Sequence, residues 1–516
     1  MDNNRTIIGK DIIESLTLGM YEDARFIFRE YIQNSADQID IAIEQDILKS
    51  KKESTIEITI DKENRRIIFY DNATGISYSK VQPILKNIAQ GTKDRTKHKG
   101  FRGIGRLGGL AYCDTLIFET SYGGEDKKSI LTWDAKKLKE IINNRKNKEE
   151  ATKVIDDITS LKTENANINE RYFKVTLENV SNEQLLDKQN IIEYLSMVAP
   201  VPYKKGFIFQ DSIYNYAKGN NYDIDEYHIY INNEQIFKPY TTSIYEGDKN
   251  NKRKVDKIHQ IEFFDIKDTT NQLISWGWFS ISNFEKKIPA INIARGIRLR
   301  KGNIQIGMSD CLIKLFKESR GSYYFFGELF AVSPQLIPNA RRDYFLENKT
   351  LICFERQCRL KFEELHKLYY FSSRIRNEKK KIDKLINFKQ EYETKVEKGF
   401  TDNAEREKYD KKLTEISDSA RNAEDQLKKT ARKLEESGST VEKKVYKEIA
   451  GKQKLNVNAL VNDFNHNSET KYITDDLTKL TRKERKMVAK IFSIIDIILT
   501  PDLANNLKEK IKEELL

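Results

Sequence analysis

The segment from Asp23 to Leu48 reads DARFIFREYIQNSADQIDIAIEQDIL and contains neither proline nor glycine. Its apolar side chains recur at intervals of three or four residues, which is the spacing of one face of a helix. The pattern therefore predicts a single long helix. The apolar face is formed by Phe28, Ile32, Ala36, Ile39 and Ile43.

The other face of this helix carries three polar residues. Glu30, Asn34 and Asp37 follow one another at i, i+4 and i+7, so their side chains lie side by side. A glutamate there can orient or deprotonate a water, and an amide oxygen can coordinate a hard cation such as magnesium. Acidic and amide residues also populate ordinary solvated helix faces, so the pattern alone indicates little.

A hairpin and a turn follow the helix. Isoleucines at 56, 58 and 60 alternate with polar residues, and a second apolar strand runs from Arg66 to Tyr70. The sequence Asp71-Asn72-Ala73-Thr74-Gly75 then leaves the sheet. A carboxylate at that exit can accept the amino group of adenine, although these residue types also favour plain turns.

A glycine-rich segment, Gly100 to Gly105, comes next and is preceded by Lys93, Arg95, Lys97 and Lys99. Glycines before a helix start expose backbone N–H groups that can hold phosphate. The segment is not a Walker loop, because no Gly-Lys-Ser/Thr ends it, and no strand feeds it directly as in the dinucleotide fingerprint. A flexible connection is the alternative interpretation.

The order and spacing of these three motifs resemble the GHKL superfamily, which includes gyrase, MutL, histidine kinases, MORC proteins and heat-shock protein 90 chaperones. The resemblance implies a Bergerat-type α/β sandwich that binds ATP with magnesium and hydrolyses it. It makes Glu30 the general base, Asn34 the magnesium ligand and Asp71 the adenine acceptor. The remaining nucleotide contacts are expected from Asp37, Gly75, Lys99, Gly100, Phe101, Arg102, Gly103, Ile104 and Gly105.

Two positions depart from the family pattern. The first glycine of the family's Asp-x-Gly-x-Gly turn is Ala73 here, which narrows the space beside the base. The family's Gly-Thr, which supports the adenine aspartate, aligns with Tyr172-Phe173. Thr176 lies on the same strand but three residues too late, so the threonine contact is in doubt.

A second region, around residues 293–343, resembles the middle domain of heat-shock protein 90 chaperones. Leu336-Ile337-Pro338-Asn339-Ala340-Arg341-Arg342-Asp343 matches a motif whose arginine reaches the terminal phosphate from outside the nucleotide domain. The resemblance assigns this role to Arg342. Lys301 is the competing candidate, because gyrase and MutL use a lysine from their second domain.

Composition limits the remaining classes. The 516 residues carry a net charge of +11 and 33% charged residues, which indicates long solvated helices and permits an anionic partner such as nucleic acid. The four cysteines and five histidines are scattered, which argues against a structural metal site or a histidine-based triad. No signal segment or apolar run long enough to span a bilayer is evident, so we expect a cytoplasmic protein without membrane contact.

The fold class expected is α/β (α+β) with four parts. They are a GHKL domain (1–190), a second α/β domain of ribosomal-S5-like or middle-domain type (191–350), an antiparallel coiled-coil hairpin (351–437) and a helical C-terminal region (438–516) that serves dimerisation. A heptad seam from Leu413 to Leu434 supports the hairpin. The charged stretch from Arg145 to Asp157 is expected to be a surface excursion, and the stripe through Met487, Ile491, Ile494 and Ile498 is expected to be core more often than a dimer face.

Two functions fit this organisation. The first is a homodimeric ATP-driven clamp related to heat-shock protein 90 that acts on a protein client or partner. The second is a MORC-like or MutL-like clamp that closes around DNA, for example in bacterial defence or DNA maintenance. A histidine kinase is not expected, because it needs a phosphoacceptor helix before the ATP domain and only about 20 residues precede the long helix.

Overall fold

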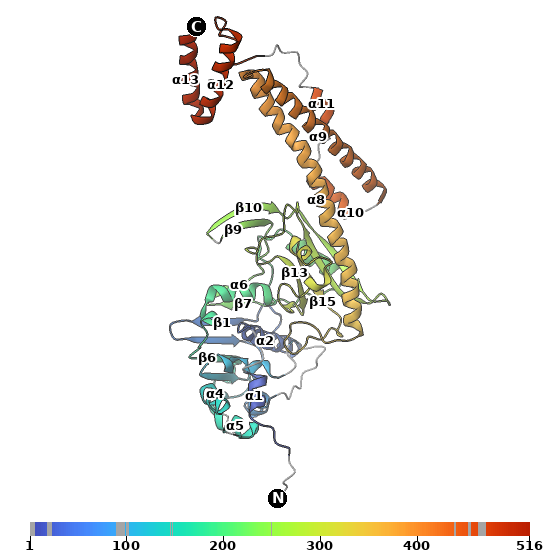
Figure 1. The fold of residues 1–516 in the computed structure, drawn as a ribbon. Helices are drawn as coiled ribbons and strands as arrows, with labels where there is room; N and C mark the ends of the chain where they lie inside the picture. Colours follow the sequence, from blue (N-terminus) through green and yellow to red (C-terminus); the bar gives the residue numbers. More distant parts are fainter. Residues whose placement is uncertain are drawn as a thin grey trace. The chain divides into compact units, whose positions relative to one another are not determined.

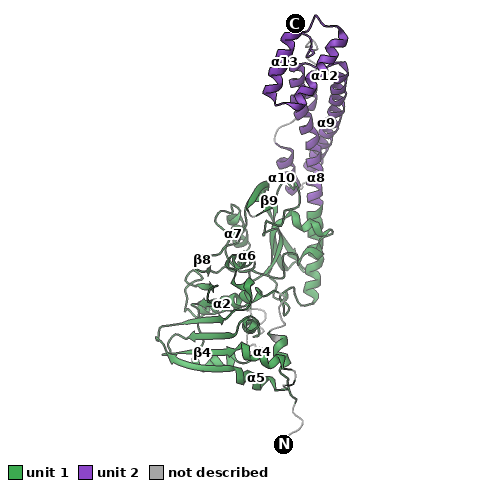
Figure 2. Cartoon of the chain, turned by 60° about the vertical axis from the view of Figure 1, so that its left-hand side comes forward, with its two compact units in different colours: residues 1–366 green, residues 367–516 purple. Residues whose placement is uncertain are grey.

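The computed structural model describes residues 6–17, 23–88, 99, 103–144, 146, 148–248, 250–437, 440–451, 456–462 and 471–516. The chain forms two compact units, residues 1–366 and 367–516 (Figure 2). The first unit is mixed α/β and the second is helical, as the sequence predicts. No described helix combines the length and the apolar character needed to cross a bilayer.

Eight strands of the first unit form one mixed sheet (Figure 1). They are β1 (Ile56–Asp61), β2 (Arg66–Asp71), β3 (Thr115–Ser121), β4 (Lys127–Asp134), β5 (Thr159–Asn165), β6 (Tyr172–Glu178), β7 (Ile229–Ile231) and β8 (Glu234–Gln235). The spatial order is β5-β4-β3-β6-β2-β1-β7-β8. Neighbours are antiparallel except β1 and β7, which run parallel. The predicted β1–β2 hairpin is confirmed, because the three isoleucines of β1 alternate buried with exposed polar residues.

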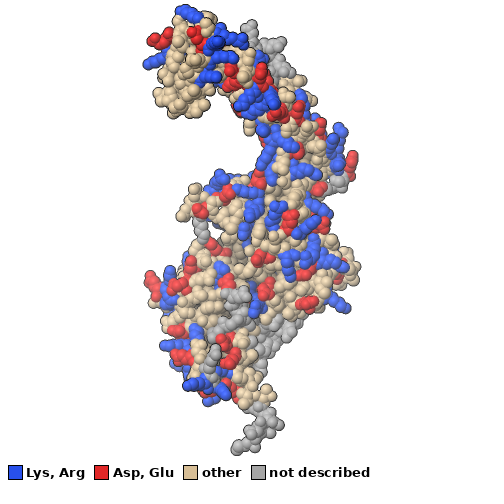
Figure 3. Space-filling view, in the orientation of Figure 1, with Lys and Arg blue, Asp and Glu red and all other residues tan. Residues whose placement is uncertain are grey.

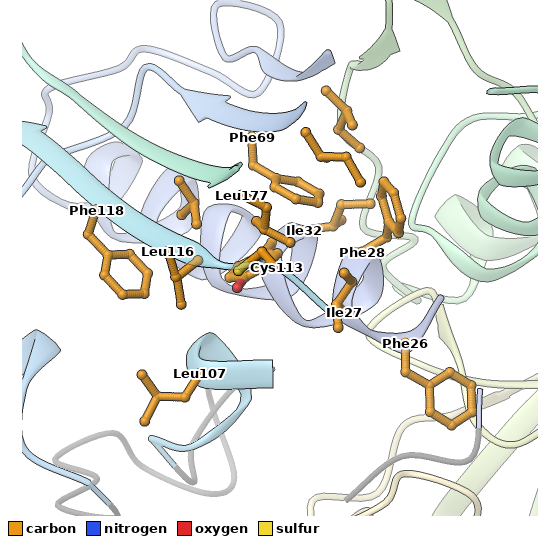
Figure 4. Packing of buried hydrophobic residues seen from close by; sticks show 14 of the residues in the cluster. Phe26, Ile27, Phe28, Ile32, Phe69, Leu107, Cys113, Leu116, Phe118 and Leu177 are labelled. Atoms are coloured by element: carbon orange, nitrogen blue, oxygen red, sulfur yellow. The ribbon is translucent and has the colours of Figure 1, made fainter. Parts of the chain in front are cut away.

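Helices of this unit pack against the sheet. The predicted long helix is α2, in which Phe28 and Ile32 lie near Phe69 of β2 (Figure 4). The rings of Phe28 and Phe69 meet edge to face, with centroids 5.2 Å apart. The other helices are α1 (Asp11–Leu16), α3 (Val81–Leu85), α4 (Ala135–Asn143), α5 (Ala151–Ile158), α6 (Lys188–Val198) and α7 (Gln210–Gly219), and α2 itself spans Phe26–Glu44.

The structure departs from the predicted organisation at two places in this unit. The sheet does not end near residue 190, because β7 pairs with β1 and β8 pairs with β7. The charged stretch that ends at Asp157, which the sequence predicts to be a surface excursion, also contributes to the core. It includes α5, which buries Ala151, Val154 and Ile158 because these residues fall on one helix face.

A second sheet of five strands completes the first unit. A two-stranded ribbon, formed by β9 and β10, comes directly before it in the sequence. The strands of the second sheet are ordered β11-β12-β15-β13-β14, and β13 runs parallel to β15. Glu328 of β15 is fully buried and pairs with two equally buried cations, Arg300 (Nε to Oε1 2.5 Å) and Lys238 (Nζ to Oε2 3.0 Å). The strands are β9 (Ser243–Asp248), β10 (Asn251–Lys257), β11 (Gln260–Lys267), β12 (Leu273–Ile281), β13 (Gly296–Lys301), β14 (Ile304–Gln305) and β15 (Phe326–Ala331).

The helix α8 leads from the first unit into the second, where it pairs with α9. Lys395 Nζ lies 3.0 Å from Glu405 Oε1 and Lys412 Nζ lies 3.6 Å from Glu391 Oε1, so later positions of α8 face earlier positions of α9 and the two helices are antiparallel. Gly399 makes the turn with a φ of +89°. The helices are α8 (Lys349–Lys398), α9 (Asn403–Ser437), α10 (Thr440–Ala450), α11 (Val457–Asn462), α12 (Arg482–Ile498) and α13 (Pro501–Leu515).

Candidate active site

The polar face of α2 is enclosed rather than solvated. Glu30 is 9% exposed and Asp37 is 2% exposed, while Asn34 is partly exposed. The opposite face anchors the helix, because Ile32, Ala36 and Ile39 are essentially inaccessible to solvent. Glu30 Oε1 is buried and accepts no hydrogen bond from the described residues. Because no hydrogen bond from the described part of the chain engages this oxygen, it can accept one from a substrate water, with the Arg342 guanidinium nearby as its counterion.

Asp71 ends β2 with its carboxylate fully buried. Oδ2 accepts a hydrogen bond from the Ser35 hydroxyl (2.7 Å) and Oδ1 accepts one from the Ala73 N–H (3.2 Å). Burial raises the pKa of Asp71 to about 6, although both hydrogen bonds act in the other direction. Each carboxylate oxygen accepts one of these hydrogen bonds and has a second lone pair. Asp71 can therefore still accept a hydrogen bond from the amino group of a base.

The turn after Asp71 packs closely on the neighbouring strands. Gly75 has a φ of +65°, and a Cβ there would lie 1.8 Å from the Ser121 carbonyl oxygen. The Ile76 N–H donates to the Thr120 hydroxyl (2.9 Å), which itself donates to the Tyr172 carbonyl (2.9 Å). Only glycine fits at position 75, so the turn keeps its backbone beside Asp71.

The described end of the glycine-rich segment lies on Glu30. Gly103 has a φ of +68°, and a Cβ at Gly105 would lie 2.1 Å from Glu30 Oε2. Ile104 is buried between them. From Gly105 to Ala111 the chain forms a 3-10 helix, and the Tyr31 hydroxyl donates to the Arg106 carbonyl (2.9 Å). Gly100, Phe101 and Arg102 lie outside the described residues.

Arg342 comes from the segment after the second sheet and reaches the polar face of α2. Its Nε lies 3.6 Å from Glu30 Oε1, and its side chain is 9% exposed. The residue adopts a left-handed φ of +54°, held by a hydrogen bond from the Gly307 N–H to its carbonyl (2.8 Å). Arg29 of α2 donates to the neighbouring Arg341 carbonyl (3.2 Å). A guanidinium therefore stands beside the buried carboxylate.

Lys301 has different surroundings. Its Nζ donates to the carbonyl of Ser333 (2.7 Å) within the second sheet region, and burial lowers the pKa of Lys301 to about 8. No contact between this ammonium and α2 occurs among the described residues. The structure thus brings Arg342, and not Lys301, to Glu30.

Two hydroxyls near Asp71 were missed by the sequence reasoning. The structure places Phe173, not a threonine, across from Asp71 on β6, and Thr176 pairs with Ile68 farther along the strand. The hydroxyl that binds Asp71 belongs to Ser35, the residue after Asn34. Ser35 follows Asn34 directly, so its side chain lies about 100° around α2 from the Glu30–Asn34–Asp37 face, and the motif did not indicate it. The contribution of Thr120 from β3 was not visible in any local motif either.

The arrangement can bind a purine nucleotide and a hard cation. Asp71 offers an acceptor for an amino group, Asn34 offers an amide oxygen, and Arg342 offers a permanent positive charge near Glu30. Among the described residues, no group of three His, Cys, Asp or Glu side chains could hold a metal by itself. A magnesium ion at Asn34 would therefore take its other ligands from phosphate and water, as magnesium usually does.

Comparisons with known proteins cover part of the chain. Residues 27–166 match the family model described as histidine kinase-, DNA gyrase B-, and HSP90-like ATPase. A stretch of 128 residues is 27% identical to the chaperone protein HtpG of Fusobacterium nucleatum. The match covers 22% of this chain and 21% of that chaperone, so the chain is compared with only about a fifth of its relative's length.

Proposed function

We propose that this chain, which belongs through residues 27–166 to the GHKL superfamily of ATPases, is an ATP-dependent molecular clamp close to HtpG. In this proposal it binds Mg-ATP, hydrolyses it to ADP and phosphate, and uses the reaction to change how its domains and a protein client or partner meet. The site geometry supports the proposal.

The positions of the side chains support the following contacts to the base and the metal. Asp71, oriented by Ser35, accepts the amino group of adenine, and Gly75 leaves room for the ring. Asn34 contributes its amide oxygen to magnesium, which neutralises charge on the phosphates. Asp37 lies on the same face, and the backbone N–H groups from Gly103 to Gly105 are proposed to bind the phosphates. The sequence assigns the same role to Gly100, Phe101 and Arg102, which lie outside the described residues.

Glu30 is the proposed general base for the reacting water. Its buried carboxylate orients the water and accepts its proton as the oxygen bonds to the terminal phosphorus. The bond from that phosphorus to the bridging oxygen then breaks, and ADP leaves with the electron pair. Gly105 lets the glycine-rich segment approach Glu30 closely, so solvent is excluded from this carboxylate.

The observation that carries the proposal is the 3.6 Å approach of Arg342 Nε to Glu30 Oε1. An arginine from outside the nucleotide domain can stabilise the charge that accumulates on the transferred phosphoryl group. Its presence at Glu30 also makes hydrolysis dependent on the position of the second sheet. This dependence is what a clamp requires, because chemistry and domain arrangement are then coupled.

A second copy of the chain is the proposed partner at the C-terminal end. The hairpin of α12 and α13 leaves its apolar stripe exposed, so the expectation that the stripe is core was wrong for the single chain. Ile497 is 81% exposed and Ile498 is 72% exposed. An apolar face of this size is unusual on a monomer, and a self-complementary contact would cover it. The exposed residues are Met487, Ile491, Ile494, Ile497, Ile498, Leu503 and Leu507.

One observation favours the DNA clamp as a second candidate. Residues 367–516 carry 34 Lys and Arg against 27 Asp and Glu, so most of the excess positive charge belongs to the helical unit. On the face shown in Figure 3, however, the cations stand among acidic residues and do not form one continuous patch. DNA binding by this unit should fall steeply with salt if the lysines contact phosphates.

The test is ATP hydrolysis by the full chain, measured beside ATP affinity. Glu30→Ala should keep ATP affinity and lose turnover by roughly 100-fold or more, the scale of general-base removal. Arg342→Ala should lower kcat strongly, whereas Arg341→Ala, which keeps the carbonyl used by Arg29, and Lys301→Ala should not. Normal turnover of Glu30→Ala, or no hydrolysis by the wild-type chain, would contradict the proposal.

A further inference from the structure

Lys99 stands directly before the glycine-rich segment and is held at both its backbone and its side chain. Its N–H donates to Asp37 Oδ1 (2.7 Å). Its Nζ donates to Asp40 Oδ2 (2.6 Å) and to the Tyr227 hydroxyl (3.0 Å), and it lies 3.3 Å from Asp225 Oδ2. The side chain is only 10% exposed. Lys99 is therefore fixed to α2 and to the chain just before β7.

The charges around Lys99 are balanced. Lys51 Nζ lies 2.7 Å from Asp225 Oδ1 and 3.4 Å from Asp40 Oδ1, so two ammonium groups face two carboxylates. Tyr227 donates its hydroxyl to Asp40 (2.7 Å) and lies beneath both ammonium groups. Burial opposes the charge on Lys99, but Asp225 and Asp40 raise its pKa above the usual value. Lys99, Lys51, Asp40, Asp225 and Tyr227 are called the Lys99 cluster below.

The Lys99 cluster is connected to the second sheet. The Asp225 carbonyl accepts a hydrogen bond from Asn303 Nδ2 (2.5 Å) at the turn between β13 and β14. Asn303 Oδ1 in turn accepts one from the buried Lys238 (2.8 Å), the partner of Glu328. Gly302, with a φ of +55°, passes close enough that a Cβ would lie 3.3 Å from Lys99 Cε. A continuous set of polar contacts thus joins Lys99 to the core of the second sheet.

We infer that Lys99 is a positioning residue that holds the start of the glycine-rich segment to α2 and to the second sheet, and that it does not bind nucleotide phosphate. A lysine ammonium has three N–H donors. Here Asp40, Asp225 and Tyr227 take all three directions, so no donor remains for a phosphate oxygen. The inference rests on the proposed ATPase function and changes the role that the sequence assigned to Lys99.

Asp225 provides the test. Within the Lys99 cluster it pairs with Lys99 and Lys51, its carbonyl binds the β13–β14 turn, and it contacts none of the described residues proposed to bind nucleotide. The full chain is compared as wild type, Lys99→Met, Asp225→Asn and the double variant, with ATP as the probe. Each single variant should leave the ATP Kd within about twofold and lower kcat by about tenfold. The double variant should be no slower than the singles, because both changes break one connection. Lys99→Arg should restore most of the rate.

Lys51→Met is the matched control, because Lys51 pairs with the same two carboxylates from a part of the chain that does not lead into the glycine-rich segment. It should reduce stability to urea as much as Lys99→Met but leave kcat within about threefold. The inference is overturned if Lys99→Met weakens ATP binding tenfold while Asp225→Asn behaves as wild type, or if neither variant changes kcat. Absence of hydrolysis in the wild-type chain would instead overturn the proposed function.

Discussion

At the scale of the residue, Asp71, the proposed adenine acceptor, carries a cost in stability. Its folded pKa of about 6 lies above the roughly 3.9 of an unfolded aspartate, because the carboxylate is buried. Between these values the folded chain holds a proton that the unfolded chain has released. The contribution of Asp71 to the free energy of unfolding is therefore greatest below about pH 4. It falls by about 3 kcal/mol as the pH rises to about 6.

Asp71→Asn should accordingly lose ATP affinity and yet resist urea better at neutral pH. The amide carries no charge to bury, so its unfolding free energy should lack the decline between pH 4 and 6 that the wild type shows. Urea unfolding at pH 4.5 and pH 7, beside calorimetry with ATP, measures both effects. Ser35→Ala is the companion variant and should weaken ATP binding by about tenfold, the scale of a hydrogen bond to a charged group. An unchanged ATP affinity in Asp71→Asn would remove the residue from the site.

Gly75 offers a steric test of the turn beside the base. Gly75→Ala combines a left-handed φ with a Cβ 1.8 Å from the Ser121 carbonyl oxygen, so the backbone has to move. The unfolding free energy should fall by about 2 kcal/mol or more. Gly124→Ala is the control, because Gly124 has a φ of +92° but open space around its Cβ position. Equal losses in the two variants would show that only the backbone angle matters.

The candidate site residues could be predicted from the sequence where they lie in a short motif within one helix or hairpin. Glu30, Asn34 and Asp71 stand in patterns that α2 and the β1–β2 hairpin carry by themselves. The Ser35 contact to Asp71 joins residues 36 positions apart, and the Arg342 approach to Glu30 joins helix α2 to the segment that follows β15. Spacing in the sequence cannot choose between Arg342 and Lys301, because only the packing of the second sheet on α2 decides which cation arrives.

At the scale of the element, local periodicity explains what could be predicted. The α2 helix and the β1 strand repeat their apolar residues over many positions, so the period is plain. The strand β7 has three residues, and its partner β1 lies about 170 positions earlier in the chain. No local pattern can report such a pairing. The α5 helix was missed because only three of its eight residues are buried and the segment around it is charged.

The seam of α9 gives a prediction at this scale. Ala420 and Ala423 are fully buried, so the neighbouring helices approach closely at these small side chains. Ala420→Leu should destabilise the helical unit by about 1–3 kcal/mol, because the added atoms cannot be accommodated without moving a helix. Thermal melting followed by circular dichroism measures the loss. Ala404→Leu, at an exposed position in the first turn of the same helix, should have almost no effect.

At the scale of the whole molecule, the exposed face of α12 and α13 predicts the assembly state. Replacing Ile494 and Ile497 together by lysine should convert a dimer to a monomer, because two charges would have to be buried in the contact. Light scattering on the full chain measures the mass. Lys486→Ala on the same helix should remain dimeric. A wild-type chain that is monomeric at every concentration would contradict the proposed homodimer and leave the ATP site unaffected.

The parallel pairing of β7 with β1 also determines where the chain can be divided. A fragment that stops at residue 190 would leave β1 as an open edge, with unsatisfied N–H and C=O groups along Ile56 to Ile58. Such an edge is a template for further strands, so the fragment should self-associate. A fragment that extends to residue 366 keeps the edge covered and should elute as a single species in size-exclusion chromatography. The first sheet is therefore completed by a short strand that the chain supplies only after α6 and α7.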